Sequence, residues 1–332
     1  MNTYILNELL KNYELKRLSS IRDAENRKKE LYLSNPKLQE LDNKLSEISI
    51  NTAKLILKSN SKESLENLKK DIENLKGEKK KILKSLNISE DYLLPKYDCK
   101  YCQDTGYVFE NGKSTMCNCL KQEIYNIEYN QKNINNITNQ TFSNFNINLY
   151  SDKIDKKKYN SNISPRENII DIKKASEYFI ENFENGETKN LLFTGGTGLG
   201  KTFLSNCIVN ELLKQGKTVM YQTAPVMLEN LISDLFAKPE NQTGISKNLL
   251  TVDLLVIDDL GTETMNSMKF TELYKIINTR LLNQNGKSLK TIISTNLDLR
   301  GLFQTYDERL VSRFVGYYDI YRFYGDDIRL KK

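Results

Sequence analysis

Apolar residues in the first quarter of the chain recur every three or four positions, which is the spacing of helices that pack along one face. In residues 36–58, where Thr52 fills the one missing step, the repeating apolar positions are Leu38, Leu41, Leu45, Ile48 and Leu55. A second run, interrupted only by Lys79, is formed by Leu65, Leu68, Ile72, Leu75, Ile82 and Leu86. Both runs have the heptad spacing of coiled-coil seams. The short polar segment 59–63 between them predicts an antiparallel helical hairpin.

Polar residues at the expected starts of the two helices support this hairpin. Asn60 followed by Glu63 has the pattern of a capping box. Asn35 precedes Pro36, and proline is favoured at the first position of a helix. Two uses of the hairpin stay open, a protein-docking arm and a helical spacer.

The pattern changes near residue 166, where short apolar runs alternate with segments of helical length. The runs are NLLFT, TVMYQ, LLVIDDL and TIISTN. Apolar runs bounded by turn or charged residues are typical of buried parallel strands. Their alternation with helices predicts a doubly wound α/β sheet. Residues 126–165, rich in Asn, Lys and Ser, are expected to be a linker and the start of this domain.

Length and composition agree with several units. The chain has 332 residues, of which 39% are hydrophobic and 28% charged, a balance that suits a globular domain joined to solvated helices. It has no run of 18 apolar residues and no secretory signal at its start, so a cytoplasmic location is expected. The net charge of +6 arises mostly in residues 1–90, with 19 basic and 14 acidic side chains. A lysine-rich solvated helix face explains this excess more simply than an anionic partner.

A glycine-rich segment follows the first strand of the α/β domain and leads into a helix. Its residues are Gly195, Gly196, Thr197, Gly198, Leu199, Gly200, Lys201 and Thr202. Glycines let the backbone wrap a phosphate chain, and the helix start directs amide groups at the anion. Lys201 is expected to reach the β and γ phosphates of ATP, and the Thr202 hydroxyl to bind Mg²⁺. The segment therefore predicts an ATP-binding phosphate loop.

Polar side chains end two of the three predicted strands that follow the loop. Asp258 and Asp259 close an apolar strand about fifty residues after the loop. We expect Asp258 to coordinate Mg²⁺ through water and Asp259 to orient the attacking water. Asn296 ends the next strand and could hold the same water near the γ phosphate. The simpler alternatives are solubilising aspartates at a strand end and a turn-forming asparagine.

Residues 297–314 are predicted to form one helix that brings Arg309 and Arg313 onto nearly one face. A guanidinium near the γ phosphate stabilises the charge that develops during phosphoryl transfer. If Arg313 acts across a subunit boundary, hydrolysis requires assembly. The alternative, a surface arginine paired with Asp307 or Glu308, suits Arg309 better than Arg313.

Together these elements resemble the AAA+ ATPases, and more closely the bacterial replicative helicase loaders of the DnaC and DnaI type, with their IstB transposition relatives. The resemblance covers about residues 140–332. It depends on the phosphate loop and on TFSNF at 141–145, SPREN at 164–168, VIDDLG at 256–261, STN at 294–296, ERLVSRF at 308–314 and GDDIRL at 325–330. By this resemblance Asn296 is similar to the family's first sensor, Arg313 to its arginine finger and Arg329 to its second sensor.

Two departures from the wider AAA+ pattern modify these expectations. Asp259 stands where most AAA+ proteins have glutamate, and its shorter side chain implies slow hydrolysis. Only 19 residues follow Arg313, too few for the usual helical lid, and loaders of this family share that feature. Arg329 would therefore approach the nucleotide from a short tail. A nucleotide-controlled switch is expected rather than a strong motor.

Four cysteines form a compact module. Cys99 and Cys102 make a CxxC pair, and Cys117 and Cys119 make a CxC pair after fourteen intervening residues. The segment between them predicts a hairpin with a turn at Asn111 and Gly112, which would bring the four sulfurs together. A structural zinc site is favoured over an iron–sulfur cluster, although spacing alone does not choose the metal. Cys207, in the phosphate-loop helix, is expected to be a buried apolar side chain.

These predictions describe four parts, a helical region (1–95), a four-cysteine zinc module (96–125), a linker (126–165) and an AAA+ ATPase domain (166–332). The resemblance implies an ATPase that loads the hexameric replicative helicase onto single-stranded DNA during replication initiation or restart, with possible self-assembly. An IstB-like transposition regulator and a nucleotide-binding adaptor with little turnover are the alternatives. Tyr221, Phe236 and Lys238 are candidates for DNA contact, against the simpler interpretation of core aromatics and a surface lysine.

Overall fold

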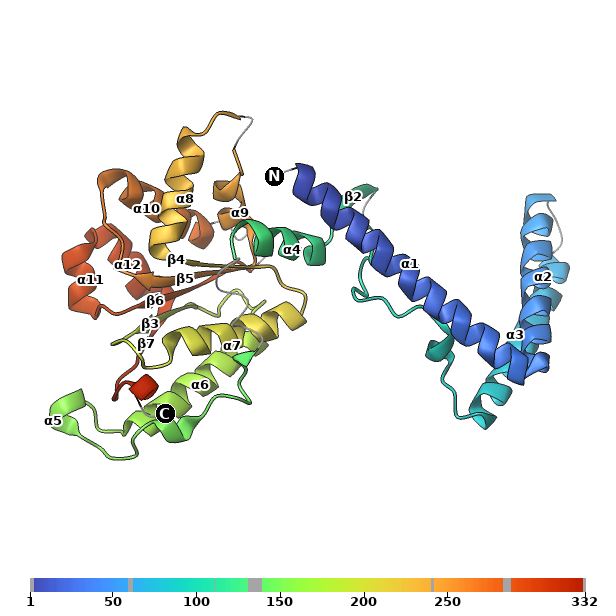
Figure 1. The fold of residues 1–332 in the computed structure, drawn as a ribbon, viewed down its shortest axis with the longest axis horizontal. Helices are drawn as coiled ribbons and strands as arrows, with labels where there is room; N and C mark the ends of the chain where they lie inside the picture. Colours follow the sequence, from blue (N-terminus) through green and yellow to red (C-terminus); the bar gives the residue numbers. More distant parts are fainter. Residues whose placement is uncertain are drawn as a thin grey trace. The chain divides into compact units, whose positions relative to one another are not determined.

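The computed structural model forms two compact units, one of residues 8–115 and one formed mainly by residues from 116 onward. We describe each by itself (Figure 1). The described residues are 3–58, 62–110, 112–130, 139–239, 242–282 and 288–330.

The first unit is built on three long helices, α1 (Thr3–Ser34), α2 (Pro36–Lys58) and α3 (Lys62–Ser85). The predicted antiparallel hairpin is confirmed by α2 and α3, which lie side by side (Figure 1). Leu38 and Leu83 are both buried in one small cluster near the base of this hairpin. The proposed cap at Asn60 lies outside the described residues.

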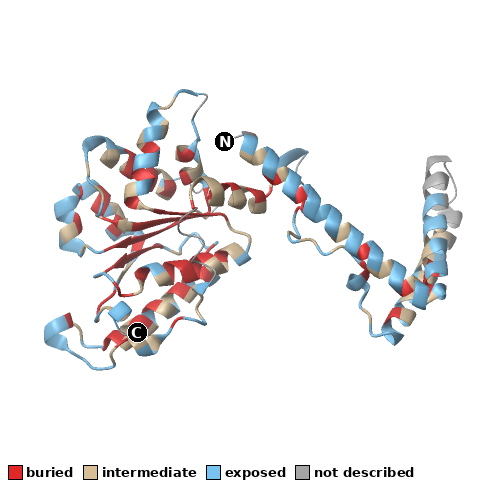
Figure 2. Cartoon of the chain, in the orientation of Figure 1, coloured by how far each residue is buried: buried red, intermediate tan, exposed pale blue. Residues whose placement is uncertain are grey.

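The single polar residue of the second heptad run has a partner inside the hairpin. Lys79 Nζ lies 2.5 Å from Asp42 Oδ1 on α2. The hydroxyl of Tyr32, on α1, donates to the other oxygen of the same carboxylate. Lys79 therefore continues the contact between the helices with an ion pair. Among the side chains of these helices that the structure describes, most of the others are exposed or half-buried, as Figure 2 shows.

The cysteine segment contains the predicted hairpin, with strands β1 (Tyr107–Glu110) and β2 (Lys113–Met116). Gly112 has a φ of +78°, the left-handed conformation that such a tight connection requires. Asn111 lies outside the described residues. Helix α4 (Asn118–Glu128) begins directly after Cys117.

The second unit contains a sheet of five parallel strands in the order β4-β5-β6-β3-β7. Their bounds are β3 (Asn190–Thr194), β4 (Val219–Thr223), β5 (Leu254–Leu260), β6 (Lys290–Thr295) and β7 (Tyr318–Arg322). Strands β3, β4, β5 and β6 are buried along almost their whole length, because helices cover both faces (Figure 2). The predicted doubly wound sheet is confirmed.

Alternate residues of the strands face two separate cores. Leu191, Tyr221 and Val256 point to the face covered by α6 (Pro165–Glu181) and α7 (Lys201–Lys214). Leu192, Met220 and Leu255 point to the opposite face. That face is covered by α8 (Ala224–Phe236), α9 (Ile245–Thr251), α10 (Ser267–Leu282), α11 (Leu299–Thr305) and α12 (Glu308–Tyr317).

The single helix predicted over residues 297–314 is wrong, since this segment forms two helices. Helix α11 ends at Thr305, and α12 begins at Glu308. The Asp307 side chain accepts the backbone N–H of Arg309 and caps the start of α12. An aspartate in this position favours a new helix start over a continuous helix.

The end of the predicted cysteine module and the start of the predicted linker pack on the sheet. The side chain of Gln122, on α4, exchanges two hydrogen bonds with the backbone of Val219, at 2.6 and 3.0 Å. The fully buried Asn130 accepts from Tyr221 N at 2.9 Å and donates to Val219 O at 3.2 Å. These amides take the place of a neighbouring strand along the open edge of β4. The four-part division of the chain stays a prediction.

One buried arginine joins several elements of this unit. Arg280, on α10, is 2% exposed and donates to the carbonyls of Leu249, Val252, Asp253 and Lys290 and to the Thr291 hydroxyl. Burial lowers its pKa to about 10, so it is still charged at neutral pH. It therefore ties α9 and the starts of β5 and β6 together.

The described residues after α12 are β7 and a short 3-10 turn, Ile328–Leu330, with no helical lid in this part of the chain. None of the helices in the described ranges has both the length and the apolar character needed to cross a membrane.

Candidate functional site

The glycine-rich segment lies between β3 and α7, and three of its glycines have positive φ. The angles are +133° at Gly195, +71° at Gly198 and +92° at Gly200. A Cβ at Gly195 would lie 2.1 Å from the carbonyl oxygen of Phe323, and one at Gly200 would lie 2.4 Å from the Tyr150 hydroxyl. Both conformation and space therefore require glycine in this loop.

Lys201 is 5% exposed and closes the loop on itself. Its Nζ donates to the carbonyls of Gly195 and Gly196 at 2.6 and 2.8 Å, and to Asn296 Oδ1 at 2.8 Å. Burial lowers the pKa of Lys201, and the nearby Asp259 and Asp258 partly oppose this shift. The fold thus brings together two residues, Lys201 and Asn296, that the sequence analysis assigned to the same phosphate group.

Asp258 lies beside the first turn of α7 and is 4% exposed. Thr202 Oγ1 donates to its Oδ2 at 3.1 Å, so the two expected Mg²⁺ ligands are neighbours. Tyr221 OH donates to the same oxygen at 2.6 Å, and the Ser294 hydroxyl donates to Oδ1. A carboxylate and a hydroxyl at the end of a phosphate loop are the oxygen donors that suit Mg²⁺.

A β-bulge sets the directions of the two aspartates. In the pairing of β5 with β6, Ile257 lies opposite Ile293 and Leu260 opposite Thr295, so Asp258 and Asp259 together face Ser294. Asp259 has a φ of +55°, and its N–H donates to Ser294 Oγ at 3.1 Å. Bulges of this kind re-aim side chains next to functional sites. Burial, followed by the charge of Asp258, raises the pKa of Asp259.

The last described residues pack against the phosphate loop. Ile328 N donates to Gly198 O at 2.9 Å. The Asp327 carboxylate approaches Gly198 so closely that a Cβ there would overlap it. Burial dominates both pKa shifts, but the charge of Arg329 adds to the lowered pKa of Lys201 and partly opposes the raised pKa of Asp259. This arginine therefore lies within electrostatic reach of the site. The short tail thus brings Arg329 near the phosphate loop, and no helical lid is needed for this.

The two arginines of α12 lie elsewhere. Arg309 is exposed and pairs with Asp307 at 2.9 Å, which matches the simpler alternative for this residue. Arg313 is half-buried, and its guanidinium lies 5.9 Å from the centre of the Tyr317 ring. It is one turn before β7, whose first residue, Tyr318, pairs with Asn190 at the start of β3. Arg313 therefore lies toward the edge of the sheet where β3 and β7 begin. The phosphate loop follows the end of β3, at the opposite edge.

One candidate for DNA contact is wrong and two stay predictions. Tyr221 is 2% exposed and bonded to Asp258, so it cannot stack on a base. Phe236 is 72% exposed at the end of α8, and Lys238 is exposed beside it. Sequence reasoning also missed Tyr150, whose hydroxyl donates to Leu199 O at 2.9 Å from a segment taken as linker. No motif marks this tyrosine.

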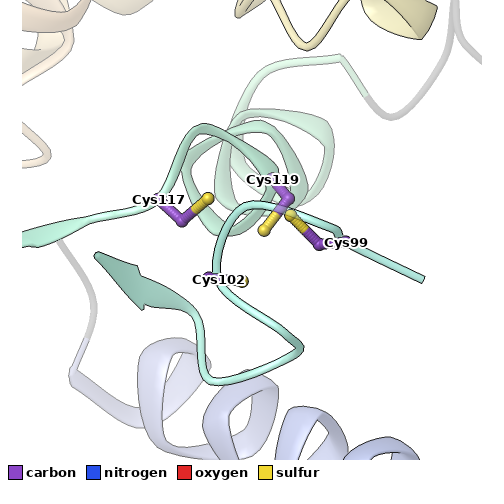
Figure 3. Close-up of side chains that lie close together, drawn as sticks. All are labelled: Cys99, Cys102, Cys117 and Cys119. Atoms are coloured by element: carbon purple, nitrogen blue, oxygen red, sulfur yellow. The ribbon is translucent and has the colours of Figure 1, made fainter. Parts of the chain in front are cut away.

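The four cysteines of the module converge. The sulfurs of Cys99, Cys102, Cys117 and Cys119 all lie within 4.8 Å of one another, as Figure 3 shows. Four sulfurs at such separations can reach one ion at the Zn–S distance of about 2.3 Å. The donor set therefore fits a thiolate-bound metal.

Asp104, which the sequence analysis did not single out, shapes the first cysteine pair. It is 2% exposed, and its carboxylate accepts the N–H groups of Asp98 and Cys99 at 2.9 and 2.8 Å. Gln103 and Asp104 both have positive φ, which turns the chain back after the pair. Cys207 is fully buried in α7, as expected.

The sheet and the loop define a P-loop ATP-binding protein of the AAA+ type. A family model described as "IstB-like ATP binding protein" matches residues 153–331, more than half of the chain. The chain belongs to this family, as a DnaC/DnaI-like AAA+ member, which confirms the resemblance stated from its motifs.

Curated relatives share this part of the chain. The replicative helicase loader DnaC of Buchnera aphidicola subsp. Schizaphis graminum is 30% identical over 143 residues, covering 42% of this chain and 55% of the relative. The DnaC of Escherichia coli K12 is 28% identical over 143 residues, covering 43% and 56%. The chain spans about half the length of these relatives. Among solved structures, AMPPCP-bound DnaA from Aquifex aeolicus is 24% identical with a TM-score of 0.44, covering 58% of this chain and 53% of that one.

Proposed function

We propose that this protein is an ATP-dependent loader of the hexameric replicative DNA helicase onto single-stranded DNA, in replication initiation or restart. One observation carries the ATP-dependent part. Lys201 joins the loop carbonyls to Asn296 beside the paired Thr202 and Asp258. The helicase partner is supported by the relatedness to proteins named replicative helicase loader.

In this proposal the loop amides from Gly195 to Thr202 hold the phosphates of ATP, with Leu199 and Thr197 completing the turn. Lys201 neutralises charge on the β and γ phosphates, and Thr202 and Asp258 hold Mg²⁺. The ion, when bound, neutralises charge on the phosphate oxygens. Asn296 hydrogen-bonds the γ phosphate or the attacking water.

Asp259 orients that water and accepts its proton. Its raised pKa improves it as a proton acceptor, because a carboxylate that holds protons more strongly is a better base. Its side chain is one methylene shorter than the glutamate of most AAA+ proteins, and its backbone is fixed at positive φ. Both features support slow turnover.

Two arginines complete the proposed site. Arg329 contacts the phosphates from the tail, as a second sensor. Arg313 acts on the nucleotide of a neighbouring subunit, which agrees with its place on α12 near the strand starts. Hydrolysis then depends on self-assembly. An oligomer formed on the helicase would place Arg313 of one subunit beside the nucleotide of the next.

The first unit is proposed to dock on the helicase. The exposed faces of α1 and of the α2–α3 hairpin offer the contact surface. Zinc bound by the four thiolates would stabilise the fold of the cysteine segment. An iron–sulfur cluster is the rival, and metal analysis of the purified protein distinguishes the two.

Reconstitution with the host helicase on single-stranded DNA tests the proposal. We expect the protein to co-purify with the helicase and to place it on DNA with ATP. Asp259→Asn should bind ATP normally and lose turnover. Glu229→Gln makes the same acid-to-amide change at an exposed position of α8 and is the control for general damage. A failure to recover helicase, with or without ATP, would contradict the loader function.

Because the matched family is described as IstB-like, the IstB-like transposition regulator remains the second candidate, and it would bind duplex DNA and a transposase. Preference for duplex over single-stranded DNA in the same assay would favour it. An adaptor without turnover would bind helicase and ATP and release no phosphate even when assembled on DNA.

A further inference from the structure

Asp258 is held on both sides by hydroxyl groups from neighbouring strands. Strands β4 and β6 flank β5 in the sheet. Tyr221 of β4 donates to Asp258 Oδ2 at 2.6 Å, and the hydroxyl of Ser294, on β6, donates to Oδ1. All three side chains are at most 4% exposed. Each oxygen of the Asp258 carboxylate therefore accepts a hydrogen bond from a buried hydroxyl group.

The strand register explains why these two hydroxyls reach one carboxylate. Tyr221 pairs with Val256, two residues before Asp258, so its long side chain lies on the same face and reaches forward. The bulge turns Asp258 toward Ser294, which a regular pairing would leave opposite a single residue.

The tyrosine itself is fixed at two ends. Its N–H donates to Asn130 Oδ1 at 2.9 Å, and its ring lies in the core with Val256 and Ile208. The ring and the backbone together place the hydroxyl where it donates to the Asp258 carboxylate.

We propose that Tyr221, together with Ser294, is a positioning residue that holds the Asp258 carboxylate in the orientation needed for Mg²⁺ coordination. This inference rests on the proposed ATP site. Thr202, the third donor to Asp258, can turn its hydroxyl to the metal, since Tyr221 and Ser294 continue to hold both oxygens. The nucleotide's phosphates are bound by other groups, so the two residues affect binding through the metal alone.

Tyr221→Phe tests this by removing the hydroxyl and keeping the ring. A fluorescent, non-hydrolysable ATP analogue is titrated with the full chain in EDTA and at increasing Mg²⁺. We expect unchanged affinity in EDTA and a half-saturating Mg²⁺ concentration at least about tenfold higher than in the native chain, as for loss of one hydrogen bond to a charged group. Tyr318→Phe, at the start of β7, is the control and should match the native chain.

Ser294→Ala gives a second measurement if Tyr221→Phe does not fold, and the same Mg²⁺-specific weakening is expected. An unchanged Mg²⁺ requirement in the folded variants overturns the inference and leaves the ATP site intact. Equal weakening in EDTA and in Mg²⁺ overturns it as well, because it indicates general damage. Absence of nucleotide binding by the native chain at every Mg²⁺ concentration overturns the proposed function and this inference together.

Discussion

The nucleotide site and the cysteine cluster are both small groups of polar side chains, but they are assembled in different ways. The nucleotide site draws on Lys201, Asp258 and Asn296, which are almost a hundred residues apart at the extremes and meet because parallel strands end together. The cluster draws on four cysteines within residues 99–119. One site depends on a buried sheet, and the other on a short segment with little core of its own.

This difference in assembly implies different sources of stability. The sheet has two apolar cores, so its site geometry is set by folding before any ligand arrives. A two-stranded hairpin is marginal in water, so we expect the cysteine segment to depend on a bound metal for its stability. We therefore expect changes in one site to leave the other nearly intact, and the following predictions test that independence.

The largest effect is expected from Lys201→Ala. It removes the charge that meets both the loop carbonyls and the phosphates, so ATP affinity should fall more than about 100-fold. Calorimetry with Mg²⁺-ATP measures it. Lys214→Ala, exposed on the same helix, should bind normally, and the metal content of the cysteine cluster should not change. Normal ATP binding by Lys201→Ala would refute the site.

Arg280→Met should destabilise the sheet unit by about 3–5 kcal/mol, because it leaves several buried carbonyls without their charged donor. Urea unfolding, followed through the fluorescence of a bound ATP analogue, measures this loss in the free energy of unfolding. Arg309→Met, on the surface, is the matched control and should unfold like the native chain. Equal unfolding midpoints for the two variants would show that the buried bonds contribute little.

Loss of a metal from the cysteine cluster should affect only the cysteine segment. A strong chelator, or Cys102→Ser, is expected to release about one metal ion per chain and to make residues 97–119 sensitive to protease. ATP affinity should change less than about twofold. Metal analysis, limited proteolysis and calorimetry check the three parts. A large loss of ATP affinity would break the proposed independence of the two sites.

The smallest effect concerns Cys207, which is a core residue and not a ligand. Burial raises the pKa of its thiol to about 12, against an ordinary value of 9. The unfolded chain can therefore ionise this thiol between pH 9 and 12 while the folded chain cannot, so stability decreases as pH rises through that window. Thermal unfolding of the native chain should decline more steeply above about pH 9 than that of Cys207→Ala. Identical pH profiles would contradict the assignment.

The predictions from sequence succeeded where spacing alone carries the signal. The phosphate loop, the strands that follow it, the heptad hairpin and the four cysteines were all found from local pattern. They failed in residues 297–314, where Asp307 caps a second helix. Of the three candidates for DNA contact, Tyr221 is a core aromatic bonded to Asp258, which matches the simpler interpretation. The partner of Tyr221 is 37 residues away in the sequence, so no local pattern marks that contact, whereas the Asp307 cap is a local signal that was overlooked.

Local sequence was enough to define the class of site, because only glycines tolerate the loop's backbone and only a few residue types bind phosphate or a soft metal. Which side chains meet was settled by folding. The bulge opposite Ser294, the amides of α4 along β4 and the tail beside Gly198 all depend on contacts between distant segments. Such contacts have no local pattern, since each is fixed by the packing of the whole sheet.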